Sequence, residues 1–214
     1  MTRTSSSDVV WHHATVTRQR REALHGHPGA VLWLTGLSGS GKSTIAHALE
    51  EALFTRGCST YVLDGDNIRH GLCGDLGVSR EHRQENIRRI AEASQLFVDA
   101  GLIVMTAFIS PFREDREHAR TLLSGSNFIE IHCACSSEVC EERDVKGLYR
   151  KARQGLIPEF TGISSPYEPP ENPELVLNTA TQSIEESVSK ILEFLVARSI
   201  VPATDANGPG ERTC

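Results

Sequence analysis

Residues 30–44 read AVLWLTGLSGSGKST, and this stretch decides the fold. Its first six residues, Ala30–Thr35, form an apolar run that stops at a glycine, as a short buried strand does. Gly36 then opens the pattern G-x-x-x-x-G-K-[ST], which is the phosphate-binding P-loop. Over Lys42–Arg56 apolar residues recur at helical spacing, and Gly57 marks the helix end. A strand, a glycine-rich loop and a helix in this order predict binding of a nucleoside triphosphate.

The chemistry of this loop follows from its residue types. Glycines let successive backbone N–H groups turn inward around phosphate oxygens, and the start of the next helix adds its positive dipole end. Lys42 supplies a mobile positive charge for the β- and γ-phosphates, and Ser43 supplies a hydroxyl for Mg²⁺. A Gly/Ser-rich turn that matches by chance is the alternative, and the flanking strand and helix disfavour it.

Beyond this motif, apolar runs alternate with amphipathic segments. Further strands are predicted at Thr60–Leu63, Leu102–Phe108, Phe128–Cys133 and Glu174–Leu177. Further helices are predicted at Asn86–Ala100, Pro111–Leu123, Ser137–Arg143 and Ser183–Ala197. Five alternations of strand and helix predict an α/β three-layer sandwich of the P-loop nucleoside triphosphate hydrolase type. It has a five-stranded parallel sheet with helices on both faces, and ligands bind beyond the carboxyl ends of the strands.

The chain is divided into an arm, one domain and a tail. Residues 1–28 are polar and mixed, with one short helix expected around Thr17–Leu24. The P-loop domain is expected over residues 29–199, and residues 200–214, rich in Gly, Pro, Asp and Asn, are expected to form a disordered tail. Residues 145–173 contain five prolines and several basic side chains, and so long a connection indicates a lid.

Composition excludes several classes of protein. The 214 residues carry 22 basic and 28 acidic side chains, a net charge of −6, so binding of nucleic acid over the whole surface is not expected. No apolar run approaches the roughly 20 residues of a membrane span. The first eight residues are polar and lack the apolar core of a secretory signal, which favours a cytoplasmic protein.

Six cysteines are scattered along the chain and do not form the framework of a small secreted domain. Cys133, Cys135 and Cys140 are close enough in sequence to suggest a metal site. However, no second Cys/His pair follows at zinc-like spacing. Small apolar packing residues are therefore the expected role.

Two carboxylates close the second predicted strand, in the run Asp64-Gly-Asp66-Asn-Ile-Arg69. This strand is expected to lie beside the P-loop strand, so that both carboxylates face the phosphate site. One carboxylate can hold Mg²⁺ through water, and the other can accept a proton from an attacking hydroxyl. The alternative is a polar turn in which Asp66 caps a helix.

Basic residues gather in the segments that follow strands two to four, although the protein is acidic overall. Any one of them alone is an ordinary surface charge, but the group indicates an anionic acceptor as well as an anionic donor. The GTPase pattern N-K-x-D is absent, so size, a single P-loop and a basic lid favour a small-molecule kinase. The group comprises Arg69, Arg83, Arg88, Arg89, Arg113, Arg116, Arg143, Arg150 and Arg153, with Lys146 and Lys151.

Longer runs carry a resemblance to a known family. They are GLSGSGKST, DGDNIR, GLCGDLG, ENIRRIAE, FISPFREDR, CEERDVKGLYRKAR and FTGISSPYEPPENPEL. From near Val10 to about Ala197 the chain resembles adenylylsulfate kinase. The resemblance implies transfer of the γ-phosphate of MgATP to the 3′-hydroxyl of adenosine 5′-phosphosulfate, in sulfate assimilation. It also implies a homodimer, while the acidic composition and the lack of a long apolar run predict no nucleic-acid and no membrane partner.

The resemblance further implies roles for individual residues. Asp66 lies near the acceptor hydroxyl, Asp64 supports Mg²⁺ or the turn, and Arg143 flanks the ATP adenine. Ser110 matches the position of a phosphoserine intermediate, although direct in-line transfer needs no covalent step. The implied ATP cradle is Gly36, Leu37, Ser38, Gly39, Ser40, Gly41, Lys42, Ser43 and Thr44. The implied acceptor contacts are Asp66, Arg69, Arg83, Asn86, Ile109, Ser110, Lys146, Leu148 and the stacking residue Phe160.

Val78 departs from the family pattern. The family usually has phenylalanine after DLG, where it sandwiches the acceptor adenine against the lid aromatic. A valine still covers a base face, but it loses a stacking contact worth roughly 1–3 kcal/mol per base. We expect weaker acceptor binding or an altered lid angle.

Two alternatives remain at this point. One is another small P-loop kinase that phosphorylates a nucleotide, a sugar or a different metabolite. The other is a non-catalytic protein that only senses the nucleotide. The non-catalytic alternative is disfavoured because the residues that catalysis requires are all present. They are Lys42, Ser43, Asp64, Asp66, Arg69 and Lys146.

Overall fold

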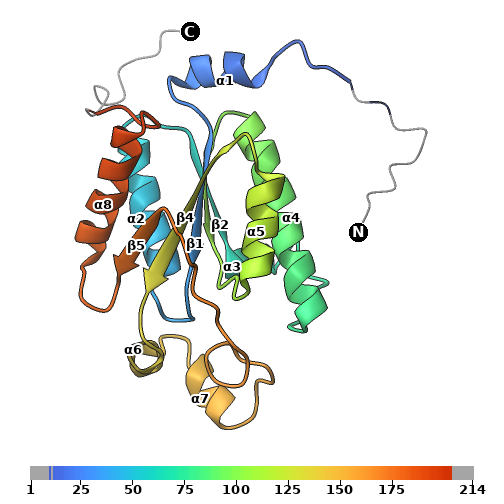
Figure 1. Cartoon of the computed structure of the whole chain (residues 1–214), viewed down its shortest axis with the longest axis vertical. Coiled ribbons are helices and arrows are strands. Elements are labelled where there is room, and N and C mark those ends of the chain that lie inside the picture. Colours follow the sequence, from blue (N-terminus) through green and yellow to red (C-terminus); the bar gives the residue numbers. More distant parts are fainter. Residues whose placement is uncertain (1–9, 11, 204–214) are drawn as a thin grey trace.

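The computed structural model describes residues 10 and 12–203, and it confirms the predicted five-stranded parallel sheet (Figure 1). The order of the strands is β2-β3-β1-β4-β5. Their bounds are β1 Ala30–Thr35, β2 Thr60–Asp64, β3 Ile103–Ala107, β4 Asn127–Ala134 and β5 Leu175–Asn178. β1 is the central strand and pairs with β3 and β4, so the P-loop leaves the middle of the sheet. The expectation that β2 lies beside β1 is wrong, because β3 is inserted between them.

Helices cover both faces of the sheet (Figure 1). α2 and α8 pack together on one face, and α4 and α5 pack together on the other. α6 and α7 lie beyond the carboxyl ends of the strands, and α1 lies at the opposite end. The bounds are α1 Arg18–His25, α2 Lys42–Thr55, α3 Gly65–Ile68, α4 Arg80–Asp99, α5 Arg113–Leu122, α6 Ser137–Arg143, α7 Leu148–Arg153 and α8 Ile184–Ala197.

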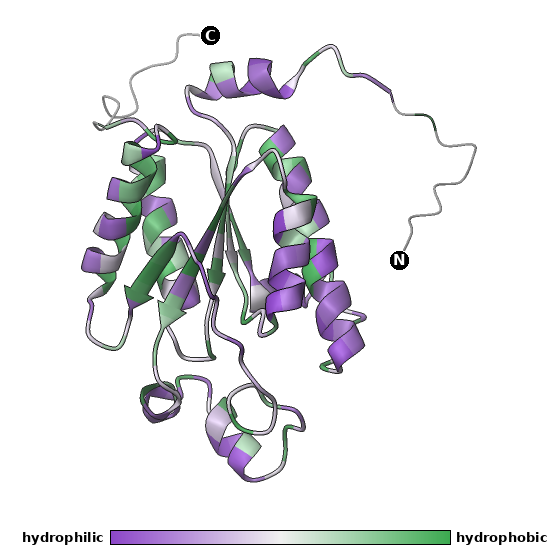
Figure 2. Cartoon of the chain, in the orientation of Figure 1, coloured by the Kyte–Doolittle hydropathy of each residue, from purple (hydrophilic) through white to green (hydrophobic). Residues whose placement is uncertain are grey.

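The central strand explains the two-sided core. All six residues of β1 are fully buried. Successive side chains of a strand point to opposite faces, so Leu32 and Leu34 join the apolar cluster on the α2/α8 face. Val31 and Trp33 join the cluster on the α4/α5 face. Each such large side chain stabilises the fold by ~1.5–3 kcal/mol. Figure 2 shows the apolar sides of the flanking helices turned toward the sheet.

Three helical segments differ from the prediction. α4 begins at Arg80 rather than at Asn86, because the Ser79 side chain accepts a hydrogen bond from the His82 N–H and caps a first turn that is entirely polar. α3 follows β2 directly, and its residues are too few for a periodic pattern. α7 lies inside the predicted lid, so the lid is not a structureless loop.

The ends of the domain also differ in part. The first helix lies within one residue of its predicted place, and Arg18 fastens it to the body by donating to the Gly125 carbonyl. Ile200 and Val201 are buried in the core, so the predicted tail begins too early at residue 200. The parts of the arm and tail in residues 1–9, 11 and 204–214 lie outside the described residues.

Two further expectations concern cysteines and membranes. Cys133 is buried in the main core and Cys140 under the lid, both as free thiols, which confirms their packing role; Cys135 is only partly buried and packs against the cluster under the lid. Among the described residues, every helix is too short or too polar to cross a bilayer.

Candidate active site

The P-loop forms a tight turn between β1 and α2. Gly36 lies in a left-handed conformation, and a Cβ on it would stand 2.6 Å from the Ser40 hydroxyl oxygen and 2.7 Å from the Cys133 carbonyl oxygen. Only glycine fits there. Gly41 has φ +87° and caps the start of α2 without a side-chain hydrogen bond. The amide groups of the loop and of the first helical turn are therefore available to an anion.

Lys42 is drawn back onto its own loop. Its Nζ donates to the Gly36 carbonyl at 2.9 Å and to the Leu37 carbonyl at 2.7 Å. Its side chain is buried, and this burial lowers the pKa of the ammonium to about 8. The buried Ser40 hydroxyl makes no hydrogen bond to any described residue. Both features fit a loop built to receive phosphate oxygens.

Asp64 is placed by the end of β2. Its Oδ1 accepts the Asp66 N–H at 2.9 Å, so Asp64, and not Asp66, is the N-cap of α3. Burial alone raises the pKa of the Asp64 carboxyl, but hydrogen bonds from the Ser43 hydroxyl and the Asp66 N–H outweigh it and lower the pKa. Its Oδ2 is buried and lacks a partner within the described residues. An ionised carboxylate with a spare oxygen beside a hydroxyl fits a Mg²⁺ ligand set.

Asp66 points to the lid. Its exposed carboxylate forms an ion pair with Lys146, which precedes α7. The two residues come from opposite sides of the site and are 80 positions apart in sequence. The contact therefore joins the end of β2 to the lid.

Arg83 forms a second connection between the body and the lid. Its Nε donates to the Val78 carbonyl at 2.8 Å, its Nη1 donates to the Thr161 hydroxyl at 2.5 Å, and its Nη2 donates to the Glu159 carbonyl. Arg69 donates to the Leu76 carbonyl at 3.1 Å and so shapes the loop that carries Val78.

Asn86 and Ser110 lie on the walls of the site. Asn86 is buried on α4, and its Nδ2 finds no partner among residues 10 and 12–203. Ser110 follows Ile109 with φ +38°, an uncommon conformation for a residue with a side chain. Ser110 is only 2 % exposed, and its hydroxyl accepts the Trp33 indole N–H at 3.2 Å. It is therefore directed into the core.

The lid has a small apolar core of its own. Phe160 meets Tyr149 edge to face, with ring centroids 5.0 Å apart, and both pack with Leu37 and Cys140. The Tyr149 hydroxyl donates to the Ser38 carbonyl at 3.0 Å. The lid therefore rests directly on the P-loop.

Arg143, at the end of α6, connects the P-loop to the segment after β5. Its guanidinium donates to the Gly39 carbonyl at 3.3 Å and to the Thr179 carbonyl at 2.6 Å. The segment that leads into α8, Gln182 and Ser183, and the first turn of α8 line the same cavity, although no sequence motif assigns them to the site. The capping box formed by Ser183 and Glu186 was the available signal, because it marks a helix start at the ligand-binding edge of the sheet.

One cavity of about 930 Å³ brings these parts together. Most of the predicted site residues line it. From the donor side these are Ser38, Gly39, Gly41, Lys42, Ser43, Thr44, Asp64 and Arg143. From the acceptor side these are Asp66, Arg69, Val78, Arg83, Asn86, Ile109, Ser110, Lys146, Leu148 and Phe160. Three P-loop residues, Gly36, Leu37 and Ser40, are buried on the side of the loop that faces the protein interior, and they do not line the cavity.

A P-loop, a capped acidic turn and a basic wall around one cavity define a P-loop kinase of small molecules. The family model of adenylylsulphate kinase matches residues 28–178, so the chain belongs to the adenylylsulfate kinase family.

Relatives match over nearly the whole length of the chain. The adenylyl-sulfate kinase of Acaryochloris marina is 61 % identical over 201 residues, which are 94 % of this chain and 98 % of the relative. The structure of the Mycobacterium tuberculosis APS kinase in complex with AMPPNP and APS has a TM-score of 0.76 and 46 % identity, over 79 % of this chain and 98 % of that one. A hexameric APS kinase from Thiobacillus denitrificans has a TM-score of 0.64 and 32 % identity, over 85 % of this chain and 30 % of that one.

Proposed function

We propose that this protein transfers the γ-phosphoryl group of ATP to the 3′-hydroxyl of adenosine 5′-phosphosulfate, releasing 3′-phosphoadenosine 5′-phosphosulfate and ADP in sulfate assimilation. The observation that carries the proposal is the cavity that joins a complete P-loop to a wall of basic side chains. A triphosphate fits the first part, and a second anionic nucleotide fits the other. The relative solved with AMPPNP and APS supports this pair of substrates.

The donor side acts by neutralising charge. Phosphoryl transfer depends on alignment and electrostatic stabilisation more than on covalent chemistry. In our proposal Lys42 leaves the Gly36 and Leu37 carbonyls and follows the γ-phosphate. Ser43 and Asp64 would hold Mg²⁺, which neutralises triphosphate charge when bound. Arg143 and the start of α8 would enclose the ATP adenine.

The acceptor side acts by placing one hydroxyl. Asp66 is an exposed carboxylate that lines the same cavity as the P-loop, and it is suited to take the proton of the attacking 3′-hydroxyl. Lys146 holds this carboxylate in place and adds positive charge for the phosphosulfate. Binding of the acceptor is assigned to Arg69, Arg83, Asn86, Ile109, Ser110, Leu148, Phe160 and Val78.

Arg83 has a particular part in this scheme, because it already contacts the lid at Thr161 and Glu159. A guanidinium that binds both the lid and the acceptor would close the lid over the bound acceptor. Closure of residues 145–173 would exclude water, which otherwise hydrolyses ATP.

Ser110 is not needed as a phosphorylated intermediate in this mechanism. Its hydroxyl is buried and bonded to Trp33, so it is not directed at the γ-phosphate. We propose direct in-line transfer, with Ser110 contributing to the wall of the acceptor site.

The quaternary state and the location complete the proposal. We propose a homodimer on the family resemblance, and light scattering on the purified protein distinguishes it from the hexameric state of one relative. We propose the cytoplasm as the location, since the five cysteines in the described residues are free thiols.

A coupled assay of ADP release tests the function. ADP should form rapidly only when Mg²⁺, ATP and adenosine 5′-phosphosulfate are all present. Lys42→Ala should abolish the transfer while the circular dichroism spectrum stays that of the wild type. Other nucleotides and sugars should not replace the acceptor. Faster turnover with one of them, or no turnover with adenosine 5′-phosphosulfate, would refute the proposal.

A further inference from the structure

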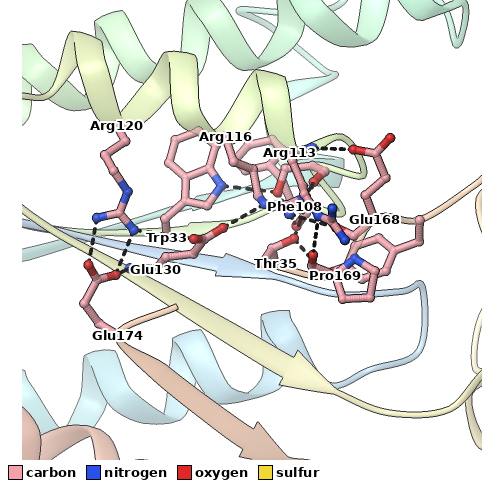
Figure 3. A network of polar contacts seen from close by, with 12 residues as sticks. Trp33, Thr35, Phe108, Arg113, Arg116, Arg120, Glu130, Glu168, Pro169 and Glu174 are labelled. Carbon is pink, nitrogen blue, oxygen red and sulfur yellow. Dashed lines mark hydrogen bonds and ion pairs between the residues drawn. The ribbon is translucent and has the colours of Figure 1, made fainter. Parts of the chain in front are cut away.

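Three segments that are distant in sequence meet behind the acceptor wall (Figure 3). Thr35 ends β1 and directly precedes the P-loop. The turn at residues 109–111 forms the wall. The return segment of the lid, residues 167–169, crosses both on its way to β5. The Glu168 N–H donates to the Pro111 carbonyl at 2.8 Å, which fixes the return segment to the turn.

The direction of the hydrogen bonds at Thr35 can be worked out. Its hydroxyl has one proton, and the 2.7 Å contact to the Ile109 carbonyl uses it, since a carbonyl can only accept. The Tyr167 hydroxyl, 3.0 Å from the same oxygen, must then be the donor. Burial raises the pKa of Tyr167 to about 12, so this hydroxyl keeps its proton at neutral pH. The result is a directed chain from Tyr167 through Thr35 to Ile109.

Arg116 connects the same segments from the side of α5. Its Nη1 donates to the Ser110 carbonyl at 2.7 Å, its Nη2 to the Glu168 carbonyl at 2.8 Å and its Nε to Glu130 at 2.7 Å. The side chain is 3 % exposed. Figure 3 shows Arg116 between Glu130 and Glu168. A planar fork with several donors suits one cation to three separate oxygens, whereas a lysine ammonium on a flexible stem does not.

The two ends of the lid are therefore held differently. The return segment is held by buried groups that the reaction does not use. The leading part is held by the contact of Tyr149 with the P-loop and also through Lys146 and Arg83, which the proposed function assigns to the acceptor.

We propose that Thr35, Arg116 and Tyr167 form a positioning junction that keeps the lid, the acceptor wall and the P-loop in register for transfer to the acceptor hydroxyl. The inference rests on the proposed function and deepens it. These are positioning residues, because they act through the Ile109–Ser110 turn and the lid and do not touch the reacting atoms. In-line transfer is sensitive to displacements of about 1 Å. Loosening the junction should therefore impair binding and turnover of the acceptor more than binding of ATP.

Tyr167→Phe is the most conservative test, because it removes only the hydroxyl and keeps the ring beside His132 and Arg116. Loss of one such hydrogen bond should raise the acceptor KM about three- to tenfold with the ATP KM near wild type. Arg116→Lys keeps the charge near Glu130 but cannot reach all three oxygens. It should lower kcat/KM for the acceptor about 10- to 100-fold.

Two matched controls separate positioning from stability. Arg120 lies one turn further along α5 and pairs with Glu174 and Glu130, but it contacts neither the turn nor the lid. Arg120→Lys should lower the melting temperature and leave the ratio of the two KM values unchanged. Tyr61→Phe removes a tyrosine hydroxyl from the outer strand β2 and should change neither quantity.

Hydrogen exchange of residues 145–173 provides a readout that does not depend on turnover. Exchange in the lid should be faster in Tyr167→Phe and Arg116→Lys than in the controls. The junction is refuted if both variants match the wild type in acceptor KM and in lid exchange. It is also refuted if they only lower the melting temperature and leave the ratio of the two KM values unchanged, as expected for Arg120→Lys. If the wild type shows no acceptor-dependent turnover, the proposed function fails, and lid exchange still decides whether the junction exists.

Discussion

Raising the pH from 7 to 9 should weaken nucleotide binding through a single group, Lys42. Its ammonium is buried, and this burial lowers its pKa to about 8 in the absence of ligand. Bound phosphate oxygens favour the charged form, so the nucleotide binds the protonated enzyme. Binding should therefore weaken as Lys42 loses its proton.

The magnitude follows from the fraction of enzyme that is protonated. With a pKa of about 8, roughly 90 % of Lys42 is charged at pH 7 and roughly 10 % at pH 9, so the Kd of the nucleotide should rise about tenfold. Near pH 8, binding should take up about half a proton.

The same group should act on stability with the opposite sign. A lysine pKa held below its ordinary value of 10.5 means that the unfolded chain binds more protons between about pH 8 and 10.5. The Lys42 contribution to the free energy of unfolding should then rise with pH across this window, by ~3 kcal/mol at most. The nearby thiols do not interfere, because burial raises the pKa of both Cys133 and Cys140 to about 12.

Isothermal titration calorimetry with a non-hydrolysable ATP analogue measures both quantities. Titrations in two buffers of different ionisation enthalpy give the proton uptake, and a pH series gives the Kd. Lys42→Arg is the control, because an arginine stays charged over the whole range and should remove the pH dependence. A Kd that is flat from pH 7 to 9, or one that rises equally in Lys42→Arg, would show that Lys42 is not the titrating group.

Three further outcomes test the site. Asp66→Asn should lower kcat about 100-fold or more with little change in ATP affinity, because an amide cannot take the hydroxyl proton; equal kcat would exclude Asp66 from the chemistry. Ser110→Ala should keep kcat within about threefold of wild type in a steady-state assay, because direct transfer does not use the hydroxyl, and loss of turnover would instead support a phosphoserine intermediate. Val78→Phe should lower the acceptor KM about tenfold, because stacking adds ~1–3 kcal/mol per base; an unchanged KM would show that Val78 does not limit binding.

The donor half of the site is predictable from sequence because its chemistry is local. The P-loop spans nine consecutive residues, and its backbone groups bind phosphate, so spacing and glycines suffice to find it. β1 and α6 have their predicted bounds for a similar reason, since one is a continuous apolar run and the other begins at a serine cap. Local signals weaken where the first turn of a helix has no apolar residue, as at Arg80 in α4, although a serine caps that helix too.

The acceptor half is harder because its geometry depends on which strands are neighbours. Alternation of strands and helices predicts a parallel sheet, but it does not say that β3 separates β1 from β2. That order places the Ile109–Ser110 turn between the P-loop and Asp64, which is why one wall can contact both substrates. Contacts such as Lys146 with Asp66 and Arg83 with Thr161 then depend on where the lid rests.

In our proposal the position of the lid depends in turn on Arg116 and Tyr167, which lie in the runs FISPFREDR and FTGISSPYEPPENPEL but have no chemical role assigned by those runs. From the sequence, each could be an ordinary surface residue. Only their burial where three segments meet distinguishes them from surface residues. An enzyme that must align two bound nucleotides needs such groups, because binding each nucleotide separately does not fix the angle between them. The residues that we propose to contact substrate can thus be identified from motifs, whereas those that we propose to hold the contacts in register are identified only from the fold.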